Sequence, residues 1–368
     1  GFQLTGSGGG QGQTNSNGGT YIYLAIAADG SIATPSLANS FATTLNNSPS
    51  NNQAVAAGFT PDAVWIKGYS GSSSHAMAWG QYDTIRGGGV EISSADADAQ
   101  YDYNTHPSGD LGMAFTATGY TTPPLVNNNV NNSVDNYVNF FWKAGGTLSI
   151  NTDGTMTSLV SANQAAGFSI VQQTSNSSND TIGHGLSAAP ELIISKNVSI
   201  SGPWGVYNAS NGINGYLYFN QTDAWASAAN VYPIVNSTVF SGGSGGWNNG
   251  TGNVYINYCF TSISGYSKVG SYSGGSSGSS NVITIGFKPS FLMVKRSNAA
   301  GDAWQIFDST MAGADTFDSY LQANTNATEA SYNQREVNFT NNGFYWTYAE
   351  SGTNISGGTY IYLAIKEN

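Results

Sequence analysis

Short apolar runs separated by Gly, Asn and Ser dominate the hydrophobic pattern of this chain. Two examples are Tyr137 to Lys143 and Asn253 to Phe260, where aromatic and β-branched residues follow one another with little alternation. Runs of this kind are typical of β-strands that are buried on both faces. A helical period is absent from any window of about a dozen residues, because Gly or Asn interrupts each candidate. The pattern predicts an all-β protein with little helix.

The apolar runs recur as parts of a repeated module. The segment Gly18 to Ile26 returns letter for letter as Gly357 to Ile365, and the two runs described above are weaker versions of this closing segment. Each complete module also has an opening segment, in which a glycine turn and a proline precede a short apolar strand. Because a lysine ends each opening strand and lysine carries its amine to water, we expect solvent-reaching strand ends at Lys67, Lys196 and Lys295.

A third shared segment places two aromatic residues three positions apart. Such positions face opposite sides of a strand, so the two rings either pack on different layers or are aligned by a bulge. We expect one ring of each pair to be buried. The pairs are Trp79 and Tyr82, Trp204 and Tyr207, and Trp304 and Phe307.

The repeat predicts tandem antiparallel β-sandwich modules of a jelly-roll-like kind, each about 90 to 120 residues long. Residues 1–30 are expected to be the closing segment of a truncated module, because Gly1 is not an initiator and the chain opens on a closing segment. Three complete modules are expected at residues 31–146, 147–262 and 263–368. We expect these modules to stack end to end.

Composition narrows the classes of partner. Only 8% of the residues are charged, against about 25% in a typical domain, while Gly occurs 47 times and aromatic residues make up 12%. The net charge of −11 repels phosphate backbones and anionic membranes. The apolar runs are also too short to span a bilayer. We therefore expect neither a nucleic-acid partner nor membrane insertion.

Residues suited to enzyme chemistry are sparse. His75, His106 and His184 lie in predicted turns or surface loops, and Cys259 lies in an apolar run that predicts a buried thiol. The segment Gly242 to Gly246 matches the letters of a nucleophile elbow but lies in a glycine tract, without the strand and helix that this motif needs. The sequence therefore predicts a protein that is not an enzyme.

One acidic segment leaves alternatives open. Strand alternation would place Asp96, Asp98 and Asp102 on one face. These carboxylates fit a solvated edge strand, a Ca²⁺ site or a carboxylate pair for acid catalysis. We favour the edge strand, keep Ca²⁺ as the alternative, and expect no other cofactor.

Several segments resemble a known group of virus proteins. Phe140 to Gly146, Ala165 to Val171 and Ile182 to Leu186 resemble parts of the glycine-rich, tail-fibre-like structural proteins of marine tailed bacteriophages, of the cyanophage and pelagiphage type. The resemblance covers nearly the whole chain. It implies a component of the virion surface, built of tandem jelly-roll-like sandwiches, with other virion proteins as partners and a homo-oligomer, preferably a trimer, as the assembly.

These observations predict a tail fibre, spike or similar appendage that supports or mediates attachment to a host cell-surface glycan or protein. A capsid-decorating or adhesive surface protein is the alternative. A polysaccharide-degrading tail spike is less favoured, because these repeats are much longer than β-helix coils. Aromatic residues outside the shared strands are candidate contacts, since they combine apolar faces with polar tips, although core packing is the other interpretation of Trp225, Trp247 and Trp346.

Overall fold

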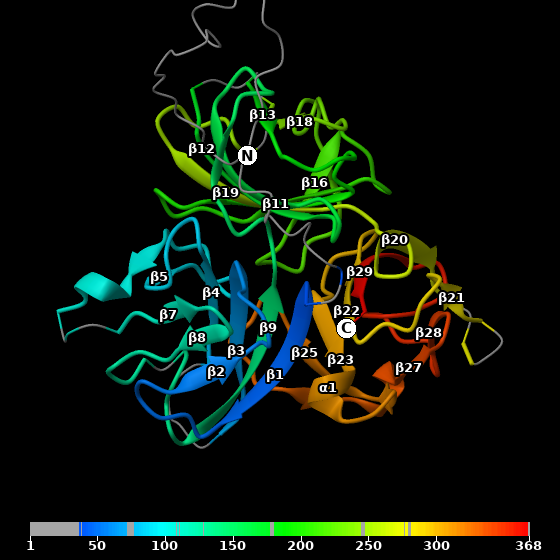
Figure 1. Ribbon diagram of the computed structural model, residues 1–368. Coiled ribbons are helices and arrows are strands. Elements are labelled where there is room, and N and C mark those ends of the chain that lie inside the picture. Colours follow the sequence, from blue (N-terminus) through cyan, green and yellow to red (C-terminus); the bar gives the residue numbers. More distant parts are fainter. Residues whose placement is uncertain are drawn as a thin grey trace, which may run out of the picture. The chain divides into compact units, whose positions relative to one another are not determined.

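Three sets of antiparallel strands repeat one order along the chain (Figure 1). The computed structural model describes residues 37, 39–71, 77–107, 109, 111–127, 129–176, 180–243, 247–275, 277–278 and 281–366. The truncated module expected at residues 1–30 lies outside these residues. We refer to residues 41–142, 149–260 and 267–365, which hold the three sets, as modules 1, 2 and 3.

Module 1 has a main sheet with the strand order β1-β9-β3-β4, a smaller sheet β2-β8-β7 and a short pair β5-β6. Its elements are β1 (Phe41–Asn47), β2 (Ala54–Ala56), β3 (Ala63–Gly71), β4 (Trp79–Asp83), β5 (Val90–Glu91), β6 (Tyr101–Asp102), the 3₁₀ turn η1 (Tyr103–Thr105), β7 (Ala114–Thr116), β8 (Gly119–Thr121) and β9 (Asp135–Trp142).

Module 2 has the longest main sheet, with the order β10-β11-β12-β19-β14-β15-β16-β17, and a small sheet β13-β18. Its strands are β10 (Ser149–Asn151), β11 (Ser158–Asn163), β12 (Phe168–Thr174), β13 (Thr181–Gly183), β14 (Leu192–Asn197), β15 (Gly205–Asn208), β16 (Gly215–Tyr218), β17 (Ala226–Ser227), β18 (Val239–Ser241) and β19 (Val254–Phe260).

Module 3 pairs a main sheet β20-β29-β22-β23-β25-β26 with a second sheet β21-β28-β27-β24. Its elements are β20 (Ser267–Ser273), β21 (Ile283–Thr284), β22 (Phe291–Arg296), β23 (Gln305–Asp308), α1 (Ser309–Ala312), β24 (Thr316–Phe317), β25 (Ser319–Gln322), β26 (Ala330–Ser331), the 3₁₀ turn η2 (Asn333–Arg335), β27 (Val337–Thr340), β28 (Gly343–Trp346) and β29 (Thr359–Ile365).

Four strands are equivalent in the three main sheets. The orders β1-β9-β3-β4, β12-β19-β14-β15 and β20-β29-β22-β23 each place the closing strand beside the opening strand. The opening and closing strands also pair in the same register in each module. The first residue of the opening strand pairs with the last residue of the closing strand in Ala63 with Trp142, Leu192 with Phe260, and Phe291 with Ile365.

One face of each main sheet packs against the smaller sheet of the same module. In module 1, Val64 and Ile66 of β3 share a core with Tyr120 of β8. Modules 2 and 3 have equivalent cores. The prediction of all-β antiparallel sandwiches with little helix is confirmed, since the described residues form a single four-residue α-helix and two 3₁₀ turns.

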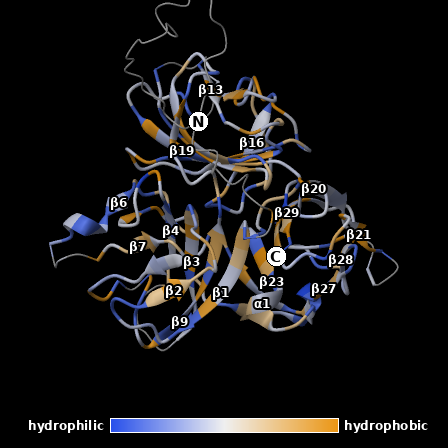
Figure 2. Ribbon diagram, viewed as in Figure 1, coloured by the Kyte–Doolittle hydropathy of each residue, from blue (hydrophilic) through white to orange (hydrophobic). Residues whose placement is uncertain are grey.

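The opposite faces of the main sheets meet in one shared core. Its residues come from all three modules, and the rings pack across the junctions, with centroids of Phe41 and Phe291 5.4 Å apart and those of Trp65 and Tyr258 6.0 Å apart. Figure 2 shows hydrophobic residues concentrated on the strands and mostly hydrophilic residues on the loops. Residues Pro35–Asn368 accordingly form one compact unit.

Both rings of each aromatic pair are buried, so the expectation of one buried ring per pair is wrong. Trp79 lies in the shared core, whereas Tyr82, three residues later, lies in the core of module 1. The other two pairs are divided in the same way. Opposite strand faces explain the arrangement, because each main sheet is covered on both sides.

The three lysines that end the opening strands are buried, which corrects the expectation that they reach water. Each amine donates to a backbone carbonyl of another module. The Nζ to O distances are 2.9 Å from Lys67 to Thr325, 2.9 Å from Lys196 to Ala97, and 3.3 Å from Lys295 to Thr222. Desolvation lowers their pKa values, to about 7 for Lys67 and about 8 for the other two.

The contacts between modules close into a ring. The indole N–H of Trp79 in module 1 donates to a carbonyl of module 3, that of Trp304 in module 3 donates to module 2, and that of Trp204 in module 2 donates to module 1. The lysine contacts follow the same direction. Modules 1 and 3 are therefore in direct contact, and the expectation of end-to-end stacking is wrong.

Candidate aromatic binding cavity

A cavity of about 260 Å³ opens on module 2 beside Trp247. The side chains that surround it are aromatic, aliphatic, small or amide-bearing, and none carries a charge. Such a concave, aromatic lining with a few polar groups is typical of small-molecule sites. The lining residues are Asn197, Ile200, Ser201, Gly202, Pro203, Tyr216, Tyr218, Trp247 and Tyr255.

Strand alternation and one glycine create this cavity. In β16, Tyr216 and Tyr218 face the cavity, while Leu217 between them is buried in the shared core. Gly205 begins β15 beneath the indole of Trp247. A Cβ at Gly205 would lie 2.0 Å from Cδ2 of Trp247, so the close approach requires glycine.

The aromatic side chains hold one another in place. The ring centroid of Trp247 lies 4.9 Å from that of Tyr216 and 5.7 Å from that of Tyr218, both edge-to-face. The indole N–H donates to the carbonyl of Pro203 at 2.9 Å. The two tyrosine hydroxyls lie 3.4 Å apart. Their hydrogen bond, followed by burial, raises the pKa of Tyr218 to about 12, so this phenol is neutral at physiological pH.

The loop on the other side of the cavity is anchored to module 1. The amine of Lys196 donates to the carbonyl of Gly202 at 2.8 Å, and the Gly202 N–H donates to the carbonyl of Ala97 at 2.7 Å. The adjacent Ile200 is 51% exposed. This wall of the cavity is therefore fixed and carries an exposed apolar side chain, and a preformed wall lowers the entropy cost of binding.

The structure separates the three tryptophans chosen as candidate contacts. Trp247 lines the cavity described above, and Trp225 lines a second cavity at the junction of modules 2 and 3. Trp346 is only 1% exposed and packs on Phe307 and Phe344 in the core of module 3, so it is a core residue and not a surface contact. Its strand, β28, faces the main sheet of its module.

The acidic segment does not form the expected strand face. Residues 94–100 are turns and irregular backbone, and only 101–102 belong to a strand. Asp96 accepts the N–H of Asp98 at 3.0 Å, while Asp102 caps η1 by accepting the N–H of Asn104 at 3.0 Å. In the part of the chain that the structure describes, no group of three or more His, Cys, Asp or Glu residues is placed to hold a metal ion.

Glu91 is a buried acid that sequence reasoning missed. Its carboxylate contacts the hydroxyl of Tyr82 and accepts from Nδ2 of Asn129 at 2.9 Å. Burial raises the pKa of Glu91 to about 7. It lines a cavity of about 270 Å³ together with Asp96 and Tyr103, among others. No sequence motif marks Glu91, because Asn129 lies 38 positions away.

The remaining candidate groups have structural roles. His184 follows β13 directly and is buried, which corrects the expected turn or surface position, with Nδ1 accepting from the Leu186 N–H and Nε2 placed 3.1 Å from the carbonyl of Asn236. Desolvation lowers its pKa. Cys259 is a buried core thiol, as predicted. His106 caps η1, whereas His75 and residues 244–246 of the glycine tract lie outside the described residues.

The chain matches, over residues 38–368, a family described as "Domain of unknown function (DUF7483)". No curated protein and no solved structure matches this chain. Among the described residues, no helix has the length and apolar character needed to cross a membrane.

Proposed function

This chain belongs to the DUF7483 family of domains of unknown function, and we propose that it is a structural protein of the bacteriophage virion surface that attaches to host glycans. A tail fibre, spike or similar appendage is the proposed location. A capsid-decorating or adhesive surface protein is the alternative, and either would use the same binding surface. The proposed partners are other virion proteins and further copies of this chain, with a trimer favoured. The sequence resemblance to marine phage proteins supports this location.

The observation that carries the binding role is the uncharged aromatic cavity beside Trp247. Tyrosine and tryptophan rings offer apolar faces to the C–H groups of a sugar, and the phenol hydroxyls exchange hydrogen bonds with sugar hydroxyls. The amide Nδ2 of Asn197 has no hydrogen-bond partner within the described chain and adds a donor at the rim. Because no lining residue is charged, we propose a neutral saccharide as the ligand.

A binding role without catalysis fits the site best. Glycoside hydrolysis needs two carboxyl groups on either side of the scissile bond, and the lining of the Trp247 cavity includes none. The carboxylates of Glu91, Asp96 and Asp98 line a different cavity, where both oxygens of Glu91 already contact protein groups. We therefore propose that the chain is not an enzyme.

Substitution of Trp247 tests the binding role. We expect Trp247→Ala to weaken binding to surface polysaccharides on a glycan microarray at least about tenfold, which corresponds to about 1.4 kcal/mol. Tyr101→Ala serves as the control, because Tyr101 is an aromatic residue 47% exposed outside this cavity. Circular dichroism would verify folding of both variants. Equal binding by Trp247→Ala and the wild-type protein would exclude this cavity as the glycan site.

The virion location requires a separate test. Antibodies against the purified chain should label intact phage particles in immunogold electron microscopy, and purified chain added to host cells should slow phage adsorption. Absence of label on intact virions would contradict the proposed location. Labelling without any effect on adsorption would leave a decorating or scaffold role.

A further inference from the structure

A second cavity, of about 330 Å³, lies where module 2 meets module 3. Its lining is uncharged and rich in hydroxyl and amide groups around one indole. The cavity is separate from the one beside Trp247, because the two share no lining residue. The lining residues are Ser210, Asn211, Ala224, Trp225, Ser297, Asn298 and Thr359.

The backbone on both sides of this cavity is fixed. The N–H of Trp225 donates to the carbonyl of Ser297 at 2.7 Å, which ties module 2 to module 3. A few residues earlier, the carbonyl of Thr222 accepts the N–H of Gly301 at 3.0 Å and the amine of Lys295 at 3.3 Å. The segment that carries the indole therefore cannot move independently of module 3.

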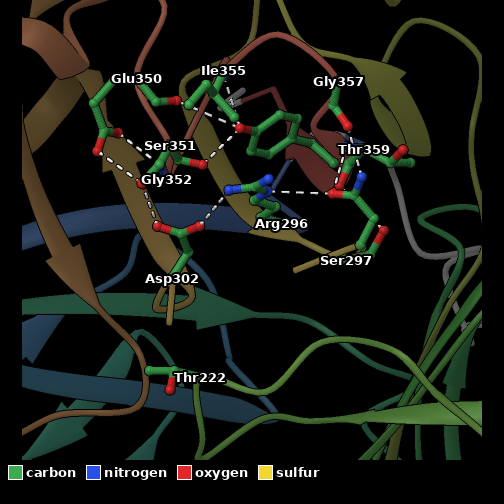
Figure 3. Close-up of polar contacts among 12 residues, drawn as sticks. Thr222, Arg296, Ser297, Asp302, Glu350, Ser351, Gly352, Ile355, Gly357 and Thr359 are labelled. Atoms are coloured by element: carbon green, nitrogen blue, oxygen red, sulfur yellow. Dashed lines mark hydrogen bonds and ion pairs between the residues drawn. The ribbon is translucent and has the colours of Figure 1, made fainter. Parts of the chain in front are cut away.

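The module 3 side is equally well tied (Figure 3). Asn298 donates through Nδ2 to the carbonyl of Gly357 at 2.7 Å and accepts the N–H of Thr359 at 3.0 Å. The N–H of Ser297 donates to the carbonyl of Thr359 at 2.8 Å. Arg296 lies behind this wall, where its Nη1 is 3.4 Å from a carboxylate oxygen of Asp302 and its Nε donates to Oδ1 of Asn298 at 3.3 Å, and Arg296 itself does not line the cavity.

The repeat of the modules shows that this junction does not need a tryptophan. The same backbone bond recurs at the other two junctions, from the Gln100 N–H to the carbonyl of Val198 at 3.1 Å and from the Glu329 N–H to the carbonyl of Tyr69 at 2.9 Å. The three residues that donate are Gln, Trp and Glu. The framework therefore uses only the N–H at this position, and the indole of Trp225 is specific to one junction.

Several polar groups at this cavity have no partner within the part of the chain that the structure describes. The indole N–H of Trp225 is one of them, in contrast to the indole N–H of Trp247, which donates to Pro203. The side-chain amide of Asn211 and the hydroxyl of Thr359 are two more. Donors and acceptors that converge on a cavity beside an aromatic ring are the groups that bind a polyhydroxyl ligand.

We propose that the Trp225 cavity is a second binding site for a neutral saccharide. The indole packs on the shared core on one side and presents its N–H to the ligand. Asn211 and Thr359 hydrogen-bond the sugar hydroxyls. A charged ligand is disfavoured because no lining side chain pairs with it, and a lipid is disfavoured because the polar lining would lose its hydrogen bonds to water. The choice of a saccharide as the ligand rests on the proposed function, whereas the site itself is inferred from the lining of the cavity.

Indole resonances offer a direct test, because the chain contains only 8 tryptophans. Protein labelled with ¹⁵N-tryptophan would be titrated in turn with the methyl glycosides of glucose, galactose, mannose and N-acetylglucosamine. Trp225→Gln and Trp247→Phe assign the two cavity resonances. Trp225→Gln introduces the side chain found at the equivalent position, Gln100, so we expect the backbone hydrogen bond from residue 225 to Ser297 to be retained.

We expect at least one of these glycosides to shift the Trp225 resonance saturably. Its affinity, measured by saturation-transfer NMR in a Trp247→Phe background, should fall at least about tenfold in Trp225→Gln. A shift of the Trp247 resonance alone would overturn this second site and leave the proposed function standing. A shift of the Trp225 resonance alone would support this second site and exclude the Trp247 cavity as a glycan site. No shift of either resonance with any glycoside would overturn both binding sites.

Discussion

Three lysine amines have been removed from water by this fold. Lys67, Lys196 and Lys295 each donate to backbone carbonyls, and none of the three forms an ion pair within the described residues. A buried cation without an anionic partner is costly, and the protein lowers this cost by shifting the pKa toward the neutral amine. Carbonyl acceptors suit both protonation states, since a neutral amine still donates.

The lowered pKa of Lys67 predicts a stability that rises with pH. Folded Lys67 loses its proton near pH 7, whereas the unfolded chain retains this proton up to about pH 10.4. Because the unfolded state binds more protons in this window, the free energy of unfolding increases with pH, by up to about 1.4 kcal/mol per unit for one such group. Urea unfolding from pH 7 to 9.5 should show a smaller slope for Lys67→Met than for the wild-type protein.

Differences between variants isolate this effect, because the other titrating groups contribute equally to both proteins. Lys288→Met is the matched control, since Lys288 is an exposed lysine paired with Asp315. Its slope should equal that of the wild-type protein. Equal slopes for Lys67→Met and the wild-type protein would show that the buried amine keeps an ordinary pKa.

At the scale of the element, strand alternation directs each side chain to one of two cores or to a cavity. In β16 the alternation that buries Leu217 also presents Tyr216 and Tyr218 to the Trp247 cavity. The neighbouring β15 begins with Gly205, over which the Trp247 ring lies. The cavity therefore depends on a single missing side chain in an adjacent strand.

Gly205→Ala should displace the indole of Trp247 and disrupt the Trp247 cavity. The added Cβ would meet the ring at 2.0 Å, and the ring must move because the strand backbone beneath it is paired. We expect glycan binding to fall at least about tenfold with the sheets retained. Gly202→Ala is the control, since Gly202 lines the same cavity and its Cβ would meet nothing within 4 Å. Unchanged binding by Gly205→Ala would mean that the ring position is unimportant.

At the scale of the whole molecule, the modules depend on one another. The shared core takes residues from all three main sheets, and the indole and lysine contacts close from module 3 back to module 1. A single module would expose its share of this core to water, for example Trp65 in module 1 or Tyr258 in module 2. The closed ring gives one chain the kind of interface that a cyclic trimer has between subunits.

One cooperative unfolding transition is the expected consequence. Scanning calorimetry on the full chain should give equal calorimetric and van't Hoff enthalpies for residues 35–368. Trp304→Phe removes the hydrogen bond from the indole N–H to the Tyr218 carbonyl. It should lower the transition temperature without splitting the transition, because the loss of a contact at one junction destabilises all three modules together. Separate transitions for separate modules would contradict the shared core.

The sequence by itself determined the strands and their repetition. Uninterrupted apolar runs, such as Tyr137 to Lys143, indicate strands covered on both faces, because local propensity and pattern are properties of the chain itself. The apolar surroundings of Cys259 were enough to predict its burial. The aromatic residues outside the repeat were enough to select Trp225 and Trp247, which both line cavities.

Only the tertiary structure decided what covers each face. The pattern around Lys67 could not reveal that its amine donates a hydrogen bond to a carbonyl of module 3, more than 250 positions away. The same limit applies to Trp346, because its neighbours along the chain do not show that β28 packs on the main sheet. Burial, cavities and lowered pKa values arise from contacts between distant segments, and a local pattern carries no information about which segments meet.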